Sequence, residues 1–171
     1  MISYSIMIQV NFFLVCFLAV YSLQTFFELG LEKLNMKYLT QRRNKVPPSF
    51  EGFVDAVRLS KINAYTFQKS CLGMERSIAS DIVLLVVILS GAMPALAWFL
   101  REQSLSIMPA GILFFLVPGL VLYLFDLPFD YYKIFVIEEK FGFNQSTFRT
   151  WLLDHIKSGL LSLVISSLML I

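Results

Sequence analysis

Residues Gln103 to Phe125 read QSLSIMPAGILFFLVPGLVLYLF, a run without one charged side chain. In hydrocarbon an unpaired backbone amide or carbonyl has no water to bond, so such a run must form a helix that satisfies its own polar groups. A helix rises about 1.5 Å per residue, and the hydrocarbon core is about 30 Å thick, so roughly 20 residues are needed to cross it. The run is long enough, and it predicts a membrane-spanning helix over about residues 105–125.

Three further stretches lack charged residues: 1–27, 82–100 and 158–171. They predict spans over about residues 2–27 and 82–100, and the start of another over 158–171. The whole chain is 57% hydrophobic with a mean hydropathy of +0.72, well above the composition of soluble domains. We therefore expect an all-α, multi-span helical membrane protein with three complete transmembrane helices plus the start of a fourth. The fourth stretch stops without a polar cap, and we interpret residues 1–171 as one domain, the front portion of a longer protein.

Basic residues predict the orientation. Residues 28–81 carry nine Lys or Arg, and residues 126–157 carry four, whereas Arg101 is the one basic residue between the second and third spans. Because basic residues in short loops are retained in the cytoplasm, both basic segments are predicted to be cytoplasmic and the N-terminus to lie outside.

The long basic segment is expected to be helical rather than a flexible linker. Pro47 and Pro48 end any preceding helix, and Ser49 is a plausible N-cap for a new one. The helix is expected to be amphipathic and to lie on the membrane surface or against a partner domain, with Asp55 paired to Arg58.

Several function classes have little support in the sequence. A net charge of +2 is too small to indicate nucleic-acid binding, and residues 1–27 lack the basic n-region of a signal peptide. Cys16 and Cys71 give no disulfide framework, and His155 is interpreted as a polar residue at the membrane interface. No His-Glu-x-x-His pattern or phosphate-binding glycine loop occurs. We predict no catalytic and no metal-binding residue in this chain.

Asp126 and Asp130 lie four residues apart at the end of the third span. Two carboxylates on one helical face are able to hold a hard cation or to take part in proton transfer. In the favoured interpretation, Asp126 instead caps the helix around Pro128 and Asp130 pairs with Lys133. Both alternatives stay open at this point.

Residues 138–147 have the composition of a helix end followed by a new helix. Glu138, Glu139 and Lys140 precede Gly142, which is predicted to be a C-cap. Asn144 or Ser146 is predicted to cap the next helix.

These segments resemble the N-terminal membrane region of the type I CAAX prenyl endopeptidases, which are multi-span zinc metalloproteases. The resemblance follows the chain from about residue 10 to residue 171, and residues 125–160 carry most of its specificity. The matching motifs are Ala64-Tyr65-Thr66 with Lys69, Asp126-Leu-Pro-Phe129 with Tyr132, and Phe135-Val-Ile-Glu-Glu139 with Gly142-Phe-Asn144.

The resemblance implies a helical membrane chamber whose zinc site is contributed by later chain through His-Glu-x-x-His and a distant Glu. None of those positions exists here, so zinc is expected in the full-length family and not in this chain. Six residues are expected to support a C-terminal protease domain through interdomain contacts: Tyr65, Lys69, Asp126, Asp130, Glu138 and Glu139.

The expected partners are the lipid bilayer, the missing protease domain, and prenylated or membrane-protein substrates. Pro47-Pro48-Ser-Phe50 resembles bacterial more than eukaryotic members of the family. This resemblance implies a bacterial cytoplasmic membrane, with the endoplasmic reticulum membrane as the alternative. The competing hypothesis is a free-standing, non-catalytic membrane scaffold or a small transporter.

Overall fold

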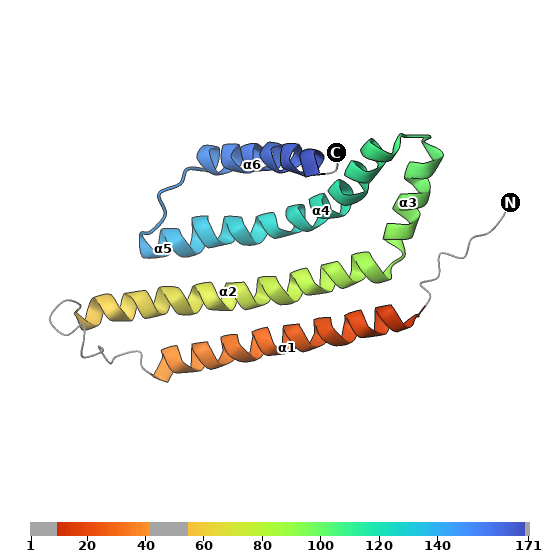
Figure 1. The fold of residues 1–171 in the computed structure, drawn as a ribbon. Coiled ribbons are helices and arrows are strands. Elements are labelled where there is room, and N and C mark those ends of the chain that lie inside the picture. Colours follow the sequence, from red (N-terminus) through yellow and green to blue (C-terminus); the bar gives the residue numbers. More distant parts are fainter. Residues whose placement is uncertain (1–9, 42–54, 170–171) are drawn as a thin grey trace. The chain divides into compact units, whose positions relative to one another are not determined.

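The computed structural model describes residues 10–41 and 55–169, and all regular structure in these ranges is helical (Figure 1). This confirms the predicted all-α class. The elements in chain order are α1 (Phe12–Gln41), α2 (Ala56–Leu89), α3 (Ala92–Glu102), α4 (Ile107–Tyr132), the π-helix η2 (Lys133–Glu138), α5 (Glu139–Phe141) and α6 (Phe148–Met169).

The described residues fall into two compact units. Within the described residues, the α4–α6 unit combines Ala79–Pro128 with the chain from Gln145 onward, and the α1–α2 unit combines residues 10–78 with Phe129–Asn144. The polar clusters described below each lie within one of these units.

Two helical stretches are long and apolar enough to cross a bilayer, Phe12–Gln41 and Ile107–Phe141. A third span results if Val57–Leu89 and Ala92–Glu102 are counted together, although the pair is bent by 53°. Three spans agree with the sequence prediction. The second predicted span, residues 82–100, differs in being broken at Ser90 and Gly91, where Gly91 has a φ of 78° that an L side chain rarely adopts.

The first two helices extend well beyond the charge-free runs. At about 1.5 Å per residue, the 30 residues of α1 and the 34 residues of α2 reach about 45 Å and 51 Å. The described part of the amphipathic helix that was predicted to follow Ser49 is therefore continuous with the second span, within α2. Its beginning at Ser49 lies outside the described residues. The carboxylate of Asp55 accepts a hydrogen bond from the backbone N–H of Arg58, as an N-cap residue does.

Apolar side chains of the described helices are largely exposed. Ile107 is 93% exposed and Phe13 81%, while the buried hydrophobic side chains among the described residues are Leu100, Ile137 and Phe141. Such a surface is suited to contact with lipid, whose tails are as apolar as these side chains.

Helix α4 continues through Pro118 and Pro128. In a membrane helix, neighbouring helices and local adjustments can compensate for the amide that each proline lacks. Because α4 extends to Tyr132, the prediction that Asp126 caps a helix around Pro128 is wrong. Asp126 lies in the helix interior, where its Oδ1 accepts a hydrogen bond from the Ser80 hydroxyl at 3.2 Å.

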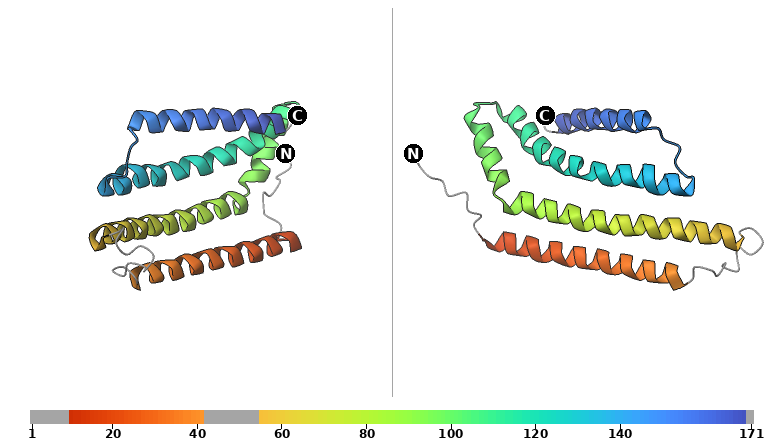
Figure 2. Two further views of the ribbon diagram at one scale, coloured as in Figure 1. Left: turned by 60° about the vertical axis from the view of Figure 1, so that its left-hand side comes forward. Right: turned by 180° about the vertical axis from the view of Figure 1, so that it is seen from behind.

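Helix α6 lies along α4 in antiparallel orientation, as both views of Figure 2 show. A groove of about 370 Å³ separates them, lined by Gly119 and Tyr123 of α4 and by Ser158, Gly159 and Ser162 of α6, among other residues. Glycines and serines at such positions allow helix backbones to approach closely in a membrane.

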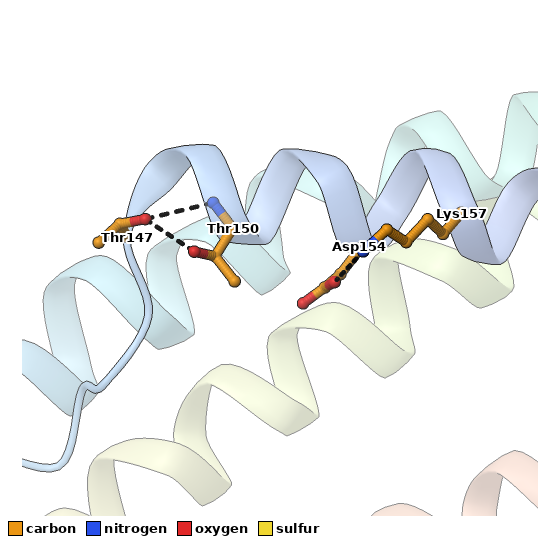
Figure 3. Close-up of polar contacts among 4 residues, drawn as sticks. All are labelled: Thr147, Thr150, Asp154 and Lys157. Atoms are coloured by element: carbon orange, nitrogen blue, oxygen red, sulfur yellow. Dashed lines mark hydrogen bonds and ion pairs between the residues drawn. The ribbon is translucent and has the colours of Figure 1, made fainter.

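Thr147 caps α6. Its Oγ1 accepts the backbone N–H of Thr150 at 3.2 Å and lies 2.9 Å from the Thr150 hydroxyl (Figure 3). The prediction that Asn144 or Ser146 caps this helix is therefore wrong by one to three residues. Asn144 instead donates its side-chain amide to Glu139 Oε2 at 2.9 Å.

Replacing Thr147 by Ala should lower the free energy of unfolding by about 1 kcal/mol, because an N–H of the first turn loses its acceptor. The check is reversible unfolding in detergent micelles followed by circular dichroism. The matched variant Thr147→Ser keeps the oxygen and should stay close to wild type. Equal stability of Thr147→Ala and wild type would contradict the assignment of the cap.

Candidate functional site: the Tyr65 joint

The helix end at Gly142 fixes the position of Glu138. The carbonyl of Glu138 accepts the backbone N–H of Phe143 at 2.8 Å, and the carbonyl of Glu139 accepts that of Gly142 at 3.0 Å. This pair of bonds, with Gly142 left-handed at a φ of 73°, is a Schellman motif. The predicted C-cap at Gly142 is confirmed. The motif turns the chain so that Phe143 comes to lie beside the preceding helical turn.

Tyr65, in the first third of the long helix α2, packs against this turn. Its ring lies edge-on to Phe143 and Phe141, with centroids 4.8 Å and 5.6 Å away. Its hydroxyl lies 3.5 Å from Glu138 Oε1. That distance is at the long end for a hydrogen bond, whereas both ring contacts are in the favourable range for aromatic pairs. The aromatic packing is therefore the stronger part of the contact.

Two lysines of α2 complete the cluster. Lys61 Nζ lies 5.6 Å from the centroid of the Phe143 ring, and Lys69 Nζ lies 5.8 Å from that of Tyr65, both within cation–π range. We call this cluster the Tyr65 joint; its members are Lys61, Tyr65, Lys69, Glu138, Phe141 and Phe143. All six lie in the α1–α2 unit.

Lys69 also borders a groove between α1 and α2. The groove has a volume of about 460 Å³ and is lined by Glu28 and Glu32 on α1 and by Lys69, Ser70 and other small or polar residues on α2. Lys69 thus belongs both to the joint and to the lining of a groove whose α1 side carries two carboxylates.

The structure brings together three of the six residues singled out from the sequence: Tyr65, Lys69 and Glu138. Glu139 lies next to the joint in sequence, and its side chain accepts a hydrogen bond from the side-chain amide of Asn144. Asp126 is bonded to Ser80 in the α4–α6 unit, and Asp130 lies half-buried near the end of α4. The sequence did not reveal Lys61, Phe141 and Phe143 as partners, because no periodic pattern links positions more than 70 residues apart.

The chemistry of the joint is that of a structural contact. Across the part of the chain that the structure describes, no three His, Cys, Asp or Glu side chains gather in a way that could hold a metal ion. The chain's one histidine, His155, lies outside the joint, with Nδ1 2.6 Å from the Tyr123 hydroxyl. The residues described here therefore do not fit a catalytic zinc, which takes three protein ligands.

Comparison with known proteins identifies the family of the chain. Residues 35–171 match the family model described as CAAX prenyl protease N-terminal, five membrane helices. The chain belongs to this family. It is 30% identical to CAAX prenyl protease 1 of Saccharomyces cerevisiae over 142 residues, and 30% identical to the CAAX prenyl protease 1 homologs of Mus musculus and Homo sapiens over 135 and 152 residues.

The alignments cover 71%, 70% and 78% of this chain, but 30%, 28% and 32% of the yeast, mouse and human proteins. The chain thus spans about a third of the length of the curated relatives that it matches. No solved structure matches it. The family and the helical architecture together establish an integral membrane protein related to a protease.

Replacing Tyr65 by Ala should lower the free energy of unfolding by about 2–3 kcal/mol, because two aromatic contacts are lost, whereas Tyr65→Phe should cost at most about 0.5 kcal/mol. Denaturant unfolding in micelles measures both. Phe99→Ala is a suitable control, since Phe99 is 53% exposed on α3 and lies outside the joint. A loss for Tyr65→Phe as large as that for Tyr65→Ala would show that the hydroxyl, and not the ring, holds the joint.

Gly142→Ala should destabilise the protein by about 1–2 kcal/mol, because an L residue is strained at positive φ. Sterics do not add to this cost, since the new Cβ would approach only Lys61 Nζ, at 4.0 Å. Gly73→Ala is the matched control: it lies within α2 with open space around it, and should stabilise by about 0.5–1 kcal/mol. Thermal unfolding of both variants tests the pair, and the same sign of change in both would contradict it.

Proposed function

We propose that this chain is the N-terminal transmembrane portion of a CAAX prenyl protease-like zinc metalloendopeptidase. In this proposal it forms part of the chamber wall and supports a zinc protease domain that residues 1–171 do not contain. The observation that carries the proposal is the family match over residues 35–171, combined with alignments that cover about a third of each relative.

The composition of the chain is the reason to place the zinc site in another part of the protein. The chain has one histidine in 171 residues, whereas a His-Glu-x-x-His motif needs two. The family that the chain resembles places its His-Glu-x-x-His helix in a later part of the sequence. Zinc, the polarised scissile carbonyl and the general base would then belong to the protease domain, while this chain supplies helices that position it.

The Tyr65 joint is proposed to stiffen the cytoplasmic ends of the helices on which that domain rests. Tyr65, Lys69 and Glu138 form it directly, Glu139 steadies the loop after it through Asn144, and Asp126 joins α4 to α2 through Ser80. Asp130 is proposed to act in the same support.

The remaining parts of the proposal concern place and substrate. The basic segments 28–81 and 126–157 are proposed to face the cytoplasm, with the N-terminus outside and a bacterial cytoplasmic membrane favoured over the endoplasmic reticulum. The relatives' names refer to prenylated CAAX proteins, and we propose those or other membrane proteins as substrates.

In a longer protein that contains this chain together with a His-Glu-x-x-His segment, replacing Glu138 and Glu139 together by Ala should lower folding yield or peptidase activity several-fold. The reason is that the Schellman turn loses its contacts to Tyr65 and Asn144. The matched control replaces Glu75 and Glu102, two exposed carboxylates outside the joint. Unchanged yield and activity in the Glu138/Glu139 variant would contradict the supporting role.

The alternative, a non-catalytic scaffold or small transporter, is tested on the gene and on the purified chain. A reading frame that continues past Ile171 into a His-Glu-x-x-His helix supports the protease, and a stop codon there supports the scaffold. The purified 171-residue chain is expected to bind no stoichiometric zinc and to cleave no peptide. Bound zinc or turnover would overturn the proposed division of labour.

A further inference from the structure

An aromatic cluster connects α4 to the first turns of α6. The Tyr123 hydroxyl lies 2.6 Å from His155 Nδ1, and the two rings are 5.8 Å apart between centroids. The Trp151 ring lies edge-on to His155 at 4.4 Å, and Phe148 stacks on Trp151 at 5.7 Å. We call Tyr123, Trp151 and His155 the aromatic anchor; all three lie in the α4–α6 unit.

Each ring of the aromatic anchor combines an apolar body with a polar atom: a phenol oxygen, an indole N–H and imidazole nitrogens. Side chains of this kind are enriched where the hydrocarbon of a bilayer meets its headgroups, because the ring replaces lipid and the polar atom stays hydrated. Tyr123 is 37% exposed and lies in a helix apolar enough to span a bilayer, so part of its ring is open to the surrounding medium.

Two charged side chains of α6 lie close to the aromatic anchor in sequence. Lys157 Nζ reaches back along α6 to Asp154 Oδ1 at 3.9 Å (Figure 3), and both side chains are mostly exposed. The ammonium therefore lies nearer the start of α6 than its own Cα. Long basic side chains bend in this way at helix ends to keep their charge out of hydrocarbon. From Ser158 onward α6 carries no charged residue.

The length of α4 up to the aromatic anchor can be compared with the thickness of the hydrocarbon core. From Ile107 to Tyr123 α4 rises about 24 Å at 1.5 Å per residue. Because α6 is antiparallel and Trp151 precedes His155 by one turn, Trp151 lies roughly 6 Å farther along the axis of α4 than Tyr123. The resulting distance of about 30 Å from the start of α4 is the thickness of a bilayer's hydrocarbon core.

We propose that Tyr123, Trp151 and His155 form an interfacial anchor that holds the α4–α6 unit at the boundary between hydrocarbon and lipid headgroups. The bilayer itself is the partner, through the zone of glycerol and ester groups. Asp154 and Lys157 lie within two turns of Trp151 on α6, and the charge-free part of the helix begins directly after them. This inference goes beyond the proposed function, since it does not depend on proteolysis or on any further domain.

Trp151 is itself the probe that tests the proposal. The chain has two tryptophans, so Trp98→Phe leaves Trp151 as the one indole. The variant is placed in phosphatidylcholine vesicles whose acyl chains carry bromine either near the headgroup or near the terminal methyl group. Bromine near the headgroup should quench Trp151 fluorescence about twofold more strongly than bromine near the methyl end, as expected for an interfacial indole.

Three results would overturn the proposal. Stronger quenching by the deep bromines would place Trp151 in the bilayer centre, and quenching by aqueous iodide alone would place it in water. Protection from all three quenchers would mean that protein covers the ring. Trp98→Tyr serves as a second background if Trp98→Phe does not fold, because it also removes the other indole while keeping a ring at position 98.

Discussion

The helical architecture depends on one constraint: backbone polar groups find no water in the hydrocarbon of a bilayer. Every segment that enters it must pair its amides and carbonyls within itself, which for a chain of this length and apolarity means helices. The apolar faces of α1 and α4 are exposed for a related reason: lipid tails are as apolar as these side chains, so burying them against protein gains little. Specific contacts are then left to a few polar and aromatic residues.

The sequence predicted the helical class and the apolar spans because charge-free runs report directly on the cost of placing charges in lipid. It was less informative about where helices begin and end. Charge says little about backbone continuity, so the joining of residues 56–81 to the second span in α2 was missed. The break at Gly91 depends on a single backbone dihedral angle, and the cap of α6 depends on one hydroxyl, that of Thr147.

For the Tyr65 joint, three of the six residues came from a resemblance, and the geometry came from the structure. Tyr65, Lys69 and Glu138 were named from motifs, and the glycine at 142 was recognisable from helix-end chemistry. Phe141 and Phe143 meet Tyr65 only because a left-handed turn folds the chain back, across a separation that no local pattern encodes. Asp126 and Ser80 meet for the same kind of long-range reason.

The π-helix η2 is a place where the length of the chain can change without turning the helix faces that follow. Its wider turn holds one residue more than an α-helical turn would, and it includes Ile137, one of the buried side chains. Removing one residue there would return the turn to an α-helical one and leave Phe141 facing in the same direction. Removing one residue from a regular turn of α4 would instead rotate everything after it by about 100°. Relatives should therefore differ in length within η2 more readily than within the α-helical turns before it.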